Sequence, residues 1–339
     1  MELTFVDLFA GVGMARMGME QAGFKCVYTC EFDKHKRKEY EIIHGNIPEG
    51  CDIRDVRATD IPRCDVWFFG APCQDFSLAG LRKGLGGDRS SLVGEVFRLI
   101  EEKAEDKSEW LVYENVKGML SSNNGYDFLS ILLAMDGLGY DVEWQTLNSK
   151  DFGIPQNRER VYTIGHLRKC GSKQILPITS TDGKDSNTKI NVVGSTNPGR
   201  KIQQRKYIYG DDGLMGCLTA TDYKEPKIVQ IGRVESDKRE NPSTYRVYDD
   251  QGLSPCLNTM QGGGREPHIL VDNDEKHGEE YVIRKLTPKE CMRLQGVPDE
   301  YTDKLIMAGI SDSQIYKAAG DGLSVPIAKE IGERIKKLT

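Results

Sequence analysis

The sequence predicts an α/β fold, in which an open and mostly parallel sheet carries helices on both faces and a smaller lobe interrupts the larger domain. Segments with strand and helix patterns alternate through the first half of the chain, as they do in sheets of this kind. The composition changes near Lys169, after which Gly, Ser, Thr, Asn and Pro are frequent and helical patterns are rare. Helical patterns return at Thr287 and again at Val325.

The elements of the first half follow one another in a regular order. The predicted strands are Leu3–Phe9, Cys26–Phe32, Asp65–Phe69, Trp110–Val116, Val142–Leu147 and Arg160–Leu167. The predicted helices are Met14–Ala22, Lys34–His44, Leu92–Ala104 and Tyr126–Leu138. Gly23 and Gly139 follow two of these helices, where glycine often ends a helix. Ligands of such sheets bind at the carboxyl ends of the strands.

The later part of the chain is expected to form a second lobe. Its short strand-like pieces are Ile228–Ile231, Tyr245–Tyr248 and His268–Val271. The segments that begin at Gly213 and Gly252 repeat each other weakly, which suggests two similar β-turn units.

Two helical segments then return the chain to the first lobe. Thr287 has the features of a helix N-cap, with Pro288 and Glu290 after it, and a last helix is expected at Val325–Lys337. We therefore predict one domain made of residues 1–168 and 284–339, into which residues 169–283 are inserted.

Composition excludes several classes of protein. The chain has 339 residues, 38% of them hydrophobic, and no apolar run of about 18 residues that could span a membrane. No signal peptide is expected from the first residues. The nine cysteines include no C-x-x-C pair, which argues against a zinc site and a disulfide framework and favours the reducing cytoplasm.

Charge is unevenly distributed. The net charge is −6, yet residues 150–210 contain twelve Lys and Arg against four Asp and Glu. Such an excess is typical of a phosphate-binding face, although a solvated, loop-rich surface explains it equally well.

The first motif, DLFAGVG, places Gly11 and Gly13 between a strand and a helix. This geometry lets a nucleotide-like ligand approach backbone amides. Glu31 ends the next strand, where a carboxylate can accept both ribose hydroxyls, and Phe32 beside it could stack on an adenine. Asp52 is placed for the adenine amino group. The alternative for Glu31 and Asp52 is ordinary surface charge.

Three further groups follow later strands. Cys73 comes just after the apolar run Val66–Phe69, where a thiolate could act as a nucleophile. Glu114 follows another apolar run, and a desolvated carboxyl there could stay protonated and act as an acid. Arg158 and Arg160 share one face of an extended segment and could hold a carbonyl oxygen or a phosphate.

These motifs together resemble one family. DLFAGVG, PCQDFS, ENVKGM, GIPQNRER, RKLTPKECMRLQGVPD and YKAAGDGLSVPIA occur in the order found in the cytosine-5 DNA methyltransferases of bacteria and phages. The resemblance runs from Leu3 to the C-terminus. It implies a Rossmann-like, S-adenosylmethionine-dependent methyltransferase sheet with a smaller, β- and loop-rich target-recognition lobe. The expected partner is double-stranded DNA, and the expected reaction is methylation of a flipped cytosine at carbon 5.

The resemblance also implies roles for single residues. Cys73 would attack carbon 6 of the base, Glu114 would protonate ring nitrogen 3, and Arg160 with Arg158 would steady the base. No metal is needed for this chemistry. The residues implied to bind S-adenosylmethionine are Phe9, Ala10, Gly11, Gly13, Met14, Glu31, Phe32, Asp52, Ile53 and Pro72.

DNA contacts are expected from two regions. The loop that follows Cys73 would close over the DNA, and residues 169–283 would form the target-recognition domain. The candidate contact residues are Gln74, Ser77, Arg82, Lys83, Ser243, Arg246, Cys256 and Met260. Arginine is the commonest reader of guanine, whereas packing is an alternative role for Cys256 and Met260.

Two positions depart from the family pattern. Met14 stands where many members have a second glycine, and Asp321 stands where the family usually has Asn. Three other functions stay open: a transfer-RNA cytosine-5 methyltransferase, a non-catalytic DNA-binding homologue, and a nicotinamide oxidoreductase suggested by the glycine loop alone. A monomer is expected, and the resemblance allows a cognate restriction endonuclease without requiring a stable protein partner.

Overall fold

The computed structural model describes residues 2–71, 91–179 and 281–339, together with residues 192–195, 207–209, 230–233, 246–249, 254, 256–257 and 268–272 between them. Across these residues, no helix is long and apolar enough to cross a membrane.

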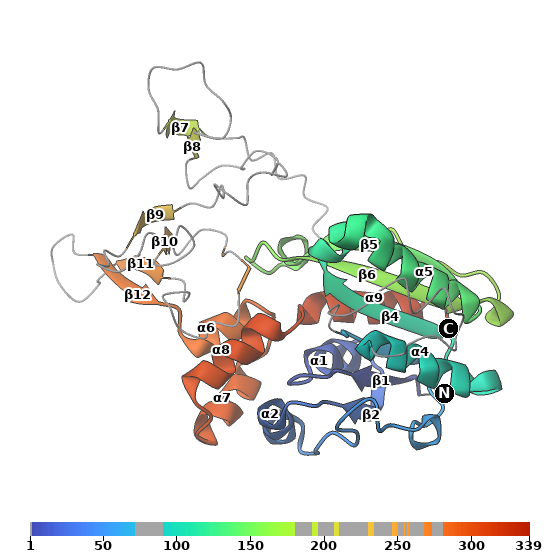
Figure 1. Ribbon diagram of the computed structural model, residues 1–339. Helices are drawn as coiled ribbons and strands as arrows, with labels where there is room; N and C mark the ends of the chain where they lie inside the picture. The colour runs from blue at the N-terminus through green and yellow to red at the C-terminus, as the bar shows by residue number, and fades with distance from the viewer. Residues whose placement is uncertain are drawn as a thin grey trace.

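A six-stranded sheet forms the centre of the larger domain (Figure 1). Its strands are β1 (Thr4–Leu8), β2 (Lys25–Cys30), β3 (Val66–Phe69), β4 (Trp110–Val116), β5 (Tyr140–Asn148) and β6 (Glu159–Leu167). Their order is β2-β1-β3-β4-β6-β5. The first four strands are parallel, and β6 is antiparallel to both β4 and β5. The prediction of an α/β fold with a mostly parallel sheet is confirmed.

The direction of β6 decides where its first residues lie. Arg160, near the start of β6, pairs with Val116 at the end of β4. Because the two strands run in opposite directions, the start of β6 and the carboxyl end of β4 occupy the same edge of the sheet. Residues that precede or begin β6 can therefore contribute to a site at that edge.

Helices cover both faces of the sheet. The helices α1 (Met14–Gln21) and α9 (Val325–Lys336) lie on one face, and α4 (Leu92–Glu102) and α5 (Tyr126–Gly137) lie on the other. Side chains of β3 alternate accordingly, with Phe68 in the cluster of α1 and α9, and Phe69 in the cluster of α4 and α5. A strand that is buried on both faces is apolar at every position, which explains its continuous hydrophobic sequence.

The remaining helices pack beside α1. These are α2 (Lys34–His44), α6 (Pro288–Arg293), α7 (Asp299–Met307) and α8 (Asp312–Asp321). Met17, Ile43, Met292, Leu305 and Ile315 belong to the apolar cluster that joins them. The predicted cap of α6 is confirmed, since Thr287 and Glu290 form a reciprocal capping box. The sequence analysis did not predict α7 and α8.

A smaller four-stranded sheet lies apart from the large one (Figure 1). It contains β9 (Gln230–Arg233), β10 (Arg246–Asp249), β11 (His268–Asp272) and β12 (Tyr281–Lys285), in the order β12-β11-β10-β9. A separate pair consists of β7 (Val192–Ser195) and β8 (Tyr207–Tyr209). Three of these strands overlap the predicted ones. The predicted repeat lies largely outside the described residues, and the domain boundaries at 169 and 283 stay predictions.

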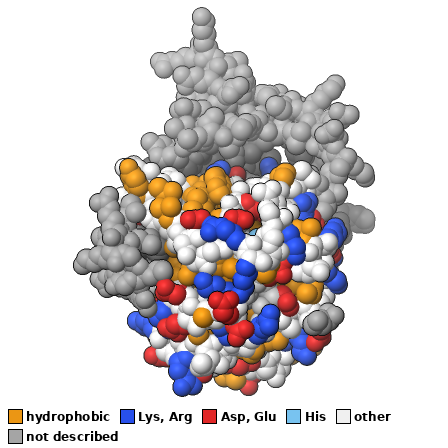
Figure 2. Space-filling view, turned by 90° about the vertical axis from the view of Figure 1, so that its right-hand side faces the viewer, with side chains coloured by type: hydrophobic (Ala, Val, Ile, Leu, Met, Phe, Trp, Pro, Cys, Tyr) orange, Lys and Arg blue, Asp and Glu red, His pale blue; other side chains and the backbone are white. Residues whose placement is uncertain are grey.

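Part of the predicted basic region is neutralised by acidic neighbours. Arg168 pairs with Asp136 and Asp141, and Lys173 pairs with Glu109 at 2.7 Å. Figure 2 shows Lys and Arg side chains interspersed with Asp and Glu on the side of the molecule where the parallel strands begin. For this part of the region, the structure favours a solvated surface over a phosphate-binding face.

Candidate active site

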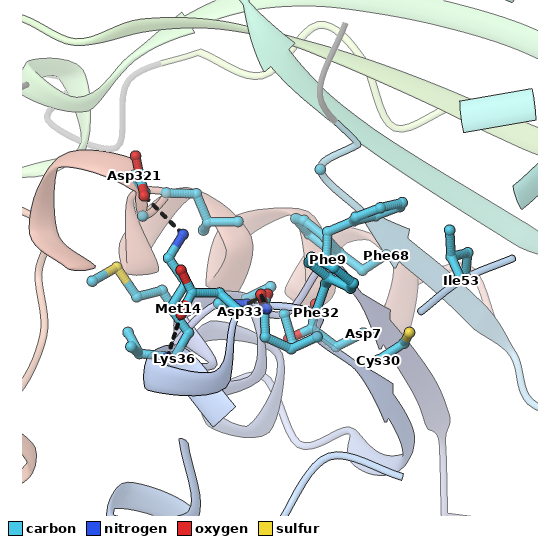
Figure 3. Close-up of a pocket in the computed structure, with 18 of the residues that line it drawn as sticks. Asp7, Phe9, Met14, Cys30, Phe32, Asp33, Lys36, Ile53, Phe68 and Asp321 are labelled. Carbon is cyan, nitrogen blue, oxygen red and sulfur yellow. Dashed lines mark hydrogen bonds and ion pairs between the residues drawn. The ribbon is translucent and has the colours of Figure 1, made fainter. Parts of the chain in front are cut away.

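A cavity of about 500 Å³ opens at the carboxyl ends of the parallel strands (Figure 3). Its volume lies in the range of small-molecule sites. The residues that line it include eight of the ten predicted cofactor residues: Phe9, Ala10, Gly11, Met14, Glu31, Phe32, Asp52 and Ile53. Strand ends far apart in the sequence therefore meet around one space.

The loop after β1 exposes its backbone to this cavity. Phe9, Gly11 and Gly13 all have positive φ angles, of 61°, 57° and 83°. A Cβ atom on Gly11 would meet nothing within 4 Å, whereas one on Gly13 would collide with the imidazole of His44. Gly13 is thus required by packing at the start of α1, and Gly11 leaves open space for a ligand.

Backbone amides fix the carboxylate of Glu31 at the end of β2. Its Oε2 accepts a hydrogen bond from the amide of Gly11 at 2.7 Å, and its Oε1 accepts one from the amide of Asp33 at 2.8 Å. The Glu31 residue is only 8% exposed, whereas the neighbouring Phe32 is 68% exposed. Each carboxylate oxygen has a second lone pair, so both can accept a further hydrogen bond from a ligand.

Asp52 and Ile53 form the wall beside β2. The bridge between Cys30 and Gly50 ties this segment to the strand. The guanidinium of Arg54 donates to both carboxylate oxygens of Asp52, and these hydrogen bonds lower the pKa of Asp52. Asp52 is therefore an anion at the cavity surface.

Glu114 lies at the edge where β3, β4 and β6 meet. Its Oε1 is 3.3 Å from Nε of Arg160, and the two side chains are 14% and 15% exposed. Burial raises the pKa of Glu114, while the positive charges of Arg160 and Arg158 oppose this shift. A Cβ atom on Gly70 would lie 3.4 Å from Oε2 of Glu114, so the segment leading to Cys73 passes beside this carboxyl group.

Asn115 fixes that same segment, and the sequence analysis did not identify it. Its Nδ2 donates to the carbonyl of Ala71 at 3.0 Å and to the hydroxyl of Tyr113 at 2.6 Å. Ala71 precedes Cys73 by two residues. A buried amide directly after Glu114 therefore connects the end of β4 to the approach to Cys73.

Arg158 makes different contacts from Arg160. It is 2% exposed, and its Nη2 donates to the carbonyls of Gly320 at 3.2 Å and Gly322 at 2.5 Å. Its Nη1 lies 3.2 Å from Sγ of Cys256, and Nη2 of Arg160 lies 3.9 Å from the same sulfur. Arg158 thus connects the end of α8 to Cys256, and the hydrogen bonds of its guanidinium are made to other residues of the protein.

Comparison with known proteins identifies the family. The family model described as "C-5 cytosine-specific DNA methylase" matches residues 3–337. This chain belongs to that family of methylases. Its members depend on S-adenosylmethionine, and the chain is a DNA (cytosine-5)-methyltransferase. The alternative of a nicotinamide oxidoreductase is therefore excluded.

The relatives of the methylase include bacterial enzymes of similar length. The Type II methyltransferase M.Bsp6I of Bacillus sp. (strain RFL6) is 34% identical, over 99% of each chain. The Type II methyltransferase M.HhaI of Haemophilus parahaemolyticus is 31% identical, over 98% of this chain and 94% of its own. The S. pombe Dnmt2 methyltransferase has the same fold, with a TM-score of 0.67 over 99% of each chain at 16% identity. The family model and the bacterial Type II relatives support a role in DNA methylation and restriction-modification.

Several predicted residues of the methylase lie outside the described part of the chain. Arg246 begins β10, of which the structure describes only the backbone. The predicted residues that the structure does not describe are Pro72, Cys73, Gln74, Ser77, Arg82, Lys83, Ser243 and Met260.

Proposed function

We propose that the methylase transfers a methyl group from S-adenosylmethionine to carbon 5 of a flipped cytosine in a short, specific sequence of duplex DNA, through a covalent bond to Cys73. The arrangement of Glu114 beside Arg160 and Gly70 carries this proposal. It combines a carboxyl of raised pKa with a fixed cation and with the segment that leads to Cys73.

The residues around the cavity fit S-adenosylmethionine. Both oxygens of Glu31 retain acceptor capacity toward ribose hydroxyls. The exposed ring of Phe32 offers a stacking surface for an adenine, and Asp52 offers an acceptor for its amino group. The open side of Gly11 lets a ligand approach the backbone. When bound, the cofactor supplies a methyl group on a sulfonium centre.

The proposed chemistry assigns one step to each residue. The Cys73 thiolate forms a bond to carbon 6 of the cytosine while Glu114 gives its proton to ring nitrogen 3, and this makes carbon 5 nucleophilic. Arg160 orients the base and Glu114 together. After carbon 5 has received the methyl group, a base removes its proton, the bond to Cys73 breaks, and Glu114 recovers the proton from nitrogen 3.

A raised pKa suits Glu114 to this role. A carboxyl group with its ordinary pKa is ionised near neutral pH and has no proton to give. Desolvation raises the pKa of Glu114, which increases the fraction of the acid form at a given pH. Asn115 would keep Cys73 in register with that acid through its bond to Ala71.

DNA recognition is proposed for two regions. Gln74, Ser77, Arg82 and Lys83 would contact DNA from the loop after Cys73, and residues 169–283 would form the target-recognition domain. Within that domain, Ser243, Arg246, Cys256 and Met260 are the candidate contact residues. The position of Cys256 beside Arg158 and Arg160 supports a place near the flipped base. A cytoplasmic location, a monomeric state and a cognate restriction endonuclease stay predictions.

A trapping experiment tests the covalent step. Fluorine at carbon 5 cannot leave as a proton does, so duplex DNA with 5-fluorocytosine at the target should hold the enzyme when S-adenosylmethionine is present. The expected product is a complex that survives denaturing electrophoresis. Cys73→Ala should abolish the complex but retain DNA binding, because phosphate contacts remain.

Transfer RNA that contains the same base serves as the control. A complex on RNA and none on DNA would favour the transfer-RNA alternative. Binding of DNA without a complex on either substrate would favour the non-catalytic homologue.

A further inference from the structure

An ion pair between two lining residues lies on the wall of the cavity where α2 and α8 meet. Nζ of Lys36 is 2.8 Å from Oδ2 of Asp321, and their side chains are 18% and 32% exposed. Both residues line the cavity. Figure 3 shows this pair at one side of the group of residues drawn, with Ile53 at the opposite side and Phe9 and Phe32 between them.

The position of the pair matches one end of the cofactor. If Glu31, Phe32 and Ile53 hold the adenosine, as the proposed function states, the amino-acid end of S-adenosylmethionine extends away from them. That end carries an ammonium and a carboxylate on adjacent carbon atoms. A complementary wall therefore needs an anion and a cation side by side.

Lys36 is the suitable cation among the described residues of the lining. The cavity is otherwise lined by many carboxylates, and its other described cation is Arg54. Arg54 binds Asp52 through three hydrogen bonds beside Ile53, at the adenosine end. Lys36 instead pairs with the carboxylate of Asp321, on the wall away from Ile53.

We propose that Lys36 and Asp321 together bind the amino-acid end of S-adenosylmethionine, with Lys36 against its carboxylate and Asp321 against its ammonium. This inference rests on the proposed function. It makes Lys36 a cofactor-binding residue that discriminates ligands with the carboxylate from ligands without it. Before a ligand binds, the ion pair satisfies both charges.

A second ion pair between the same helices provides a matched control. Nζ of Lys317 is 2.8 Å from Oδ2 of Asp33, so this pair also joins α8 to α2. Lys317 does not line the cavity. Its partner Asp33 lines the cavity beside Glu31, at the adenosine end. Removing the charge of Lys317 therefore weakens the contact between the helices while Lys36 and Asp321 stay in place.

Calorimetric titration of two product-like ligands tests the inference. S-adenosylhomocysteine has the amino-acid end, and 5′-methylthioadenosine has the same adenosine and sulfur without it. Lys36→Met should weaken S-adenosylhomocysteine by about tenfold or more, the scale of a charge-assisted hydrogen bond, and leave 5′-methylthioadenosine unchanged. Lys36→Arg should retain most of the affinity, and Lys317→Met should not distinguish the two ligands, because its partner Asp33 lies at the adenosine end that both ligands have.

Other outcomes separate this inference from the proposed function. Equal losses for both ligands in Lys36→Met, equal effects of Lys36→Met and Lys317→Met, or no effect of Lys36→Met would each overturn the role of Lys36. Wild-type protein that binds neither ligand would instead contradict the cofactor part of the proposed function.

Discussion

Glu31 and Glu114 line the same cavity at the same edge of the sheet, yet their surroundings are opposite. Two backbone amides donate to Glu31, and they fix its oxygens in position as acceptors toward a ligand. Glu114 has a pKa raised by burial and lies beside Arg160, an arrangement suited to a group that gives and recovers a proton. The comparison teaches that the partners of a carboxyl group, rather than its place at a strand end, determine what it can do.

The largest expected effect comes from replacing the carboxyl group of Glu114 with a group that has no acidic proton. Glu114→Gln should reduce the rate of methyl transfer by about 10²–10⁴-fold, the usual contribution of a general acid, because a neutral amide cannot protonate nitrogen 3. The dissociation constant for S-adenosylhomocysteine should stay the same. Single-turnover kinetics measures the rate, and calorimetry measures the dissociation constant. A large loss of ligand affinity would show that Glu114, like Glu31, contributes to cofactor binding.

Glu31 should show the reverse pattern. Glu31→Ala should weaken the cofactor by about 1.5–3 kcal/mol, the scale of hydrogen bonds to a charged group, because both ribose hydroxyls lose their acceptor. At saturating cofactor, the rate should approach that of the wild type. Calorimetry gives the first result and saturation kinetics the second. An unchanged dissociation constant would remove Glu31 from the site.

A third carboxyl group, Asp7, extends the comparison to a buried carboxyl group whose effect is on stability. Burial raises the pKa of Asp7 to about 8, against a hydrogen bond from the backbone of Arg16, and its Oδ2 has no partner. The folded state therefore holds this proton more tightly than the unfolded state does. The stability that the neutral form contributes is present below about pH 4 and is lost as the pH rises through about 8.

Asp7→Asn removes this ionisation. The difference in unfolding free energy between the variant and the wild type should be more favourable to the variant at pH 8.5 than at pH 5. The change should be at least about 1 kcal/mol, since one pKa unit corresponds to 1.36 kcal/mol. Urea unfolding at the two pH values measures the difference. An equal effect of the substitution at both values would show that Asp7 has its ordinary pKa.

The sequence predicts the centre of the large sheet well because β3 and the first four residues of β4 are continuous apolar runs. The predicted strand Trp110–Val116 agrees with β4, and the predicted helix Lys34–His44 agrees with α2. Glu31 and Glu114 could be identified because each lies near the end of a predicted strand. A strand end is a local feature, so one sequence is enough to find it.

Long-range contacts could not be predicted in this way. Asn115 binds Ala71, which is 44 positions away along the chain, and no local pattern connects them. Arg158 and Arg160 were predicted to share a role because alternate residues of a strand share a face. However, β6 begins at Glu159, and the guanidinium of Arg158 binds carbonyls of residues 320 and 322. Only the folded structure separates these two arginines.

The packing of α9 on α1 has a consequence for how the enzyme is made. A Cβ atom on Gly18 would lie 2.6 Å from the Cβ atom of Ala328, so the two helices touch along their backbones. Chains are synthesised from the N-terminus and domains generally fold as units, so the face that α1 covers stays incomplete until α9 has left the ribosome. By then residues 169–283 have already been made, and a chain that stops before residue 312 lacks both α9 and the cavity wall from α8. Interrupted synthesis therefore gives no chain in which α9 packs on α1 but residues 169–283 are missing.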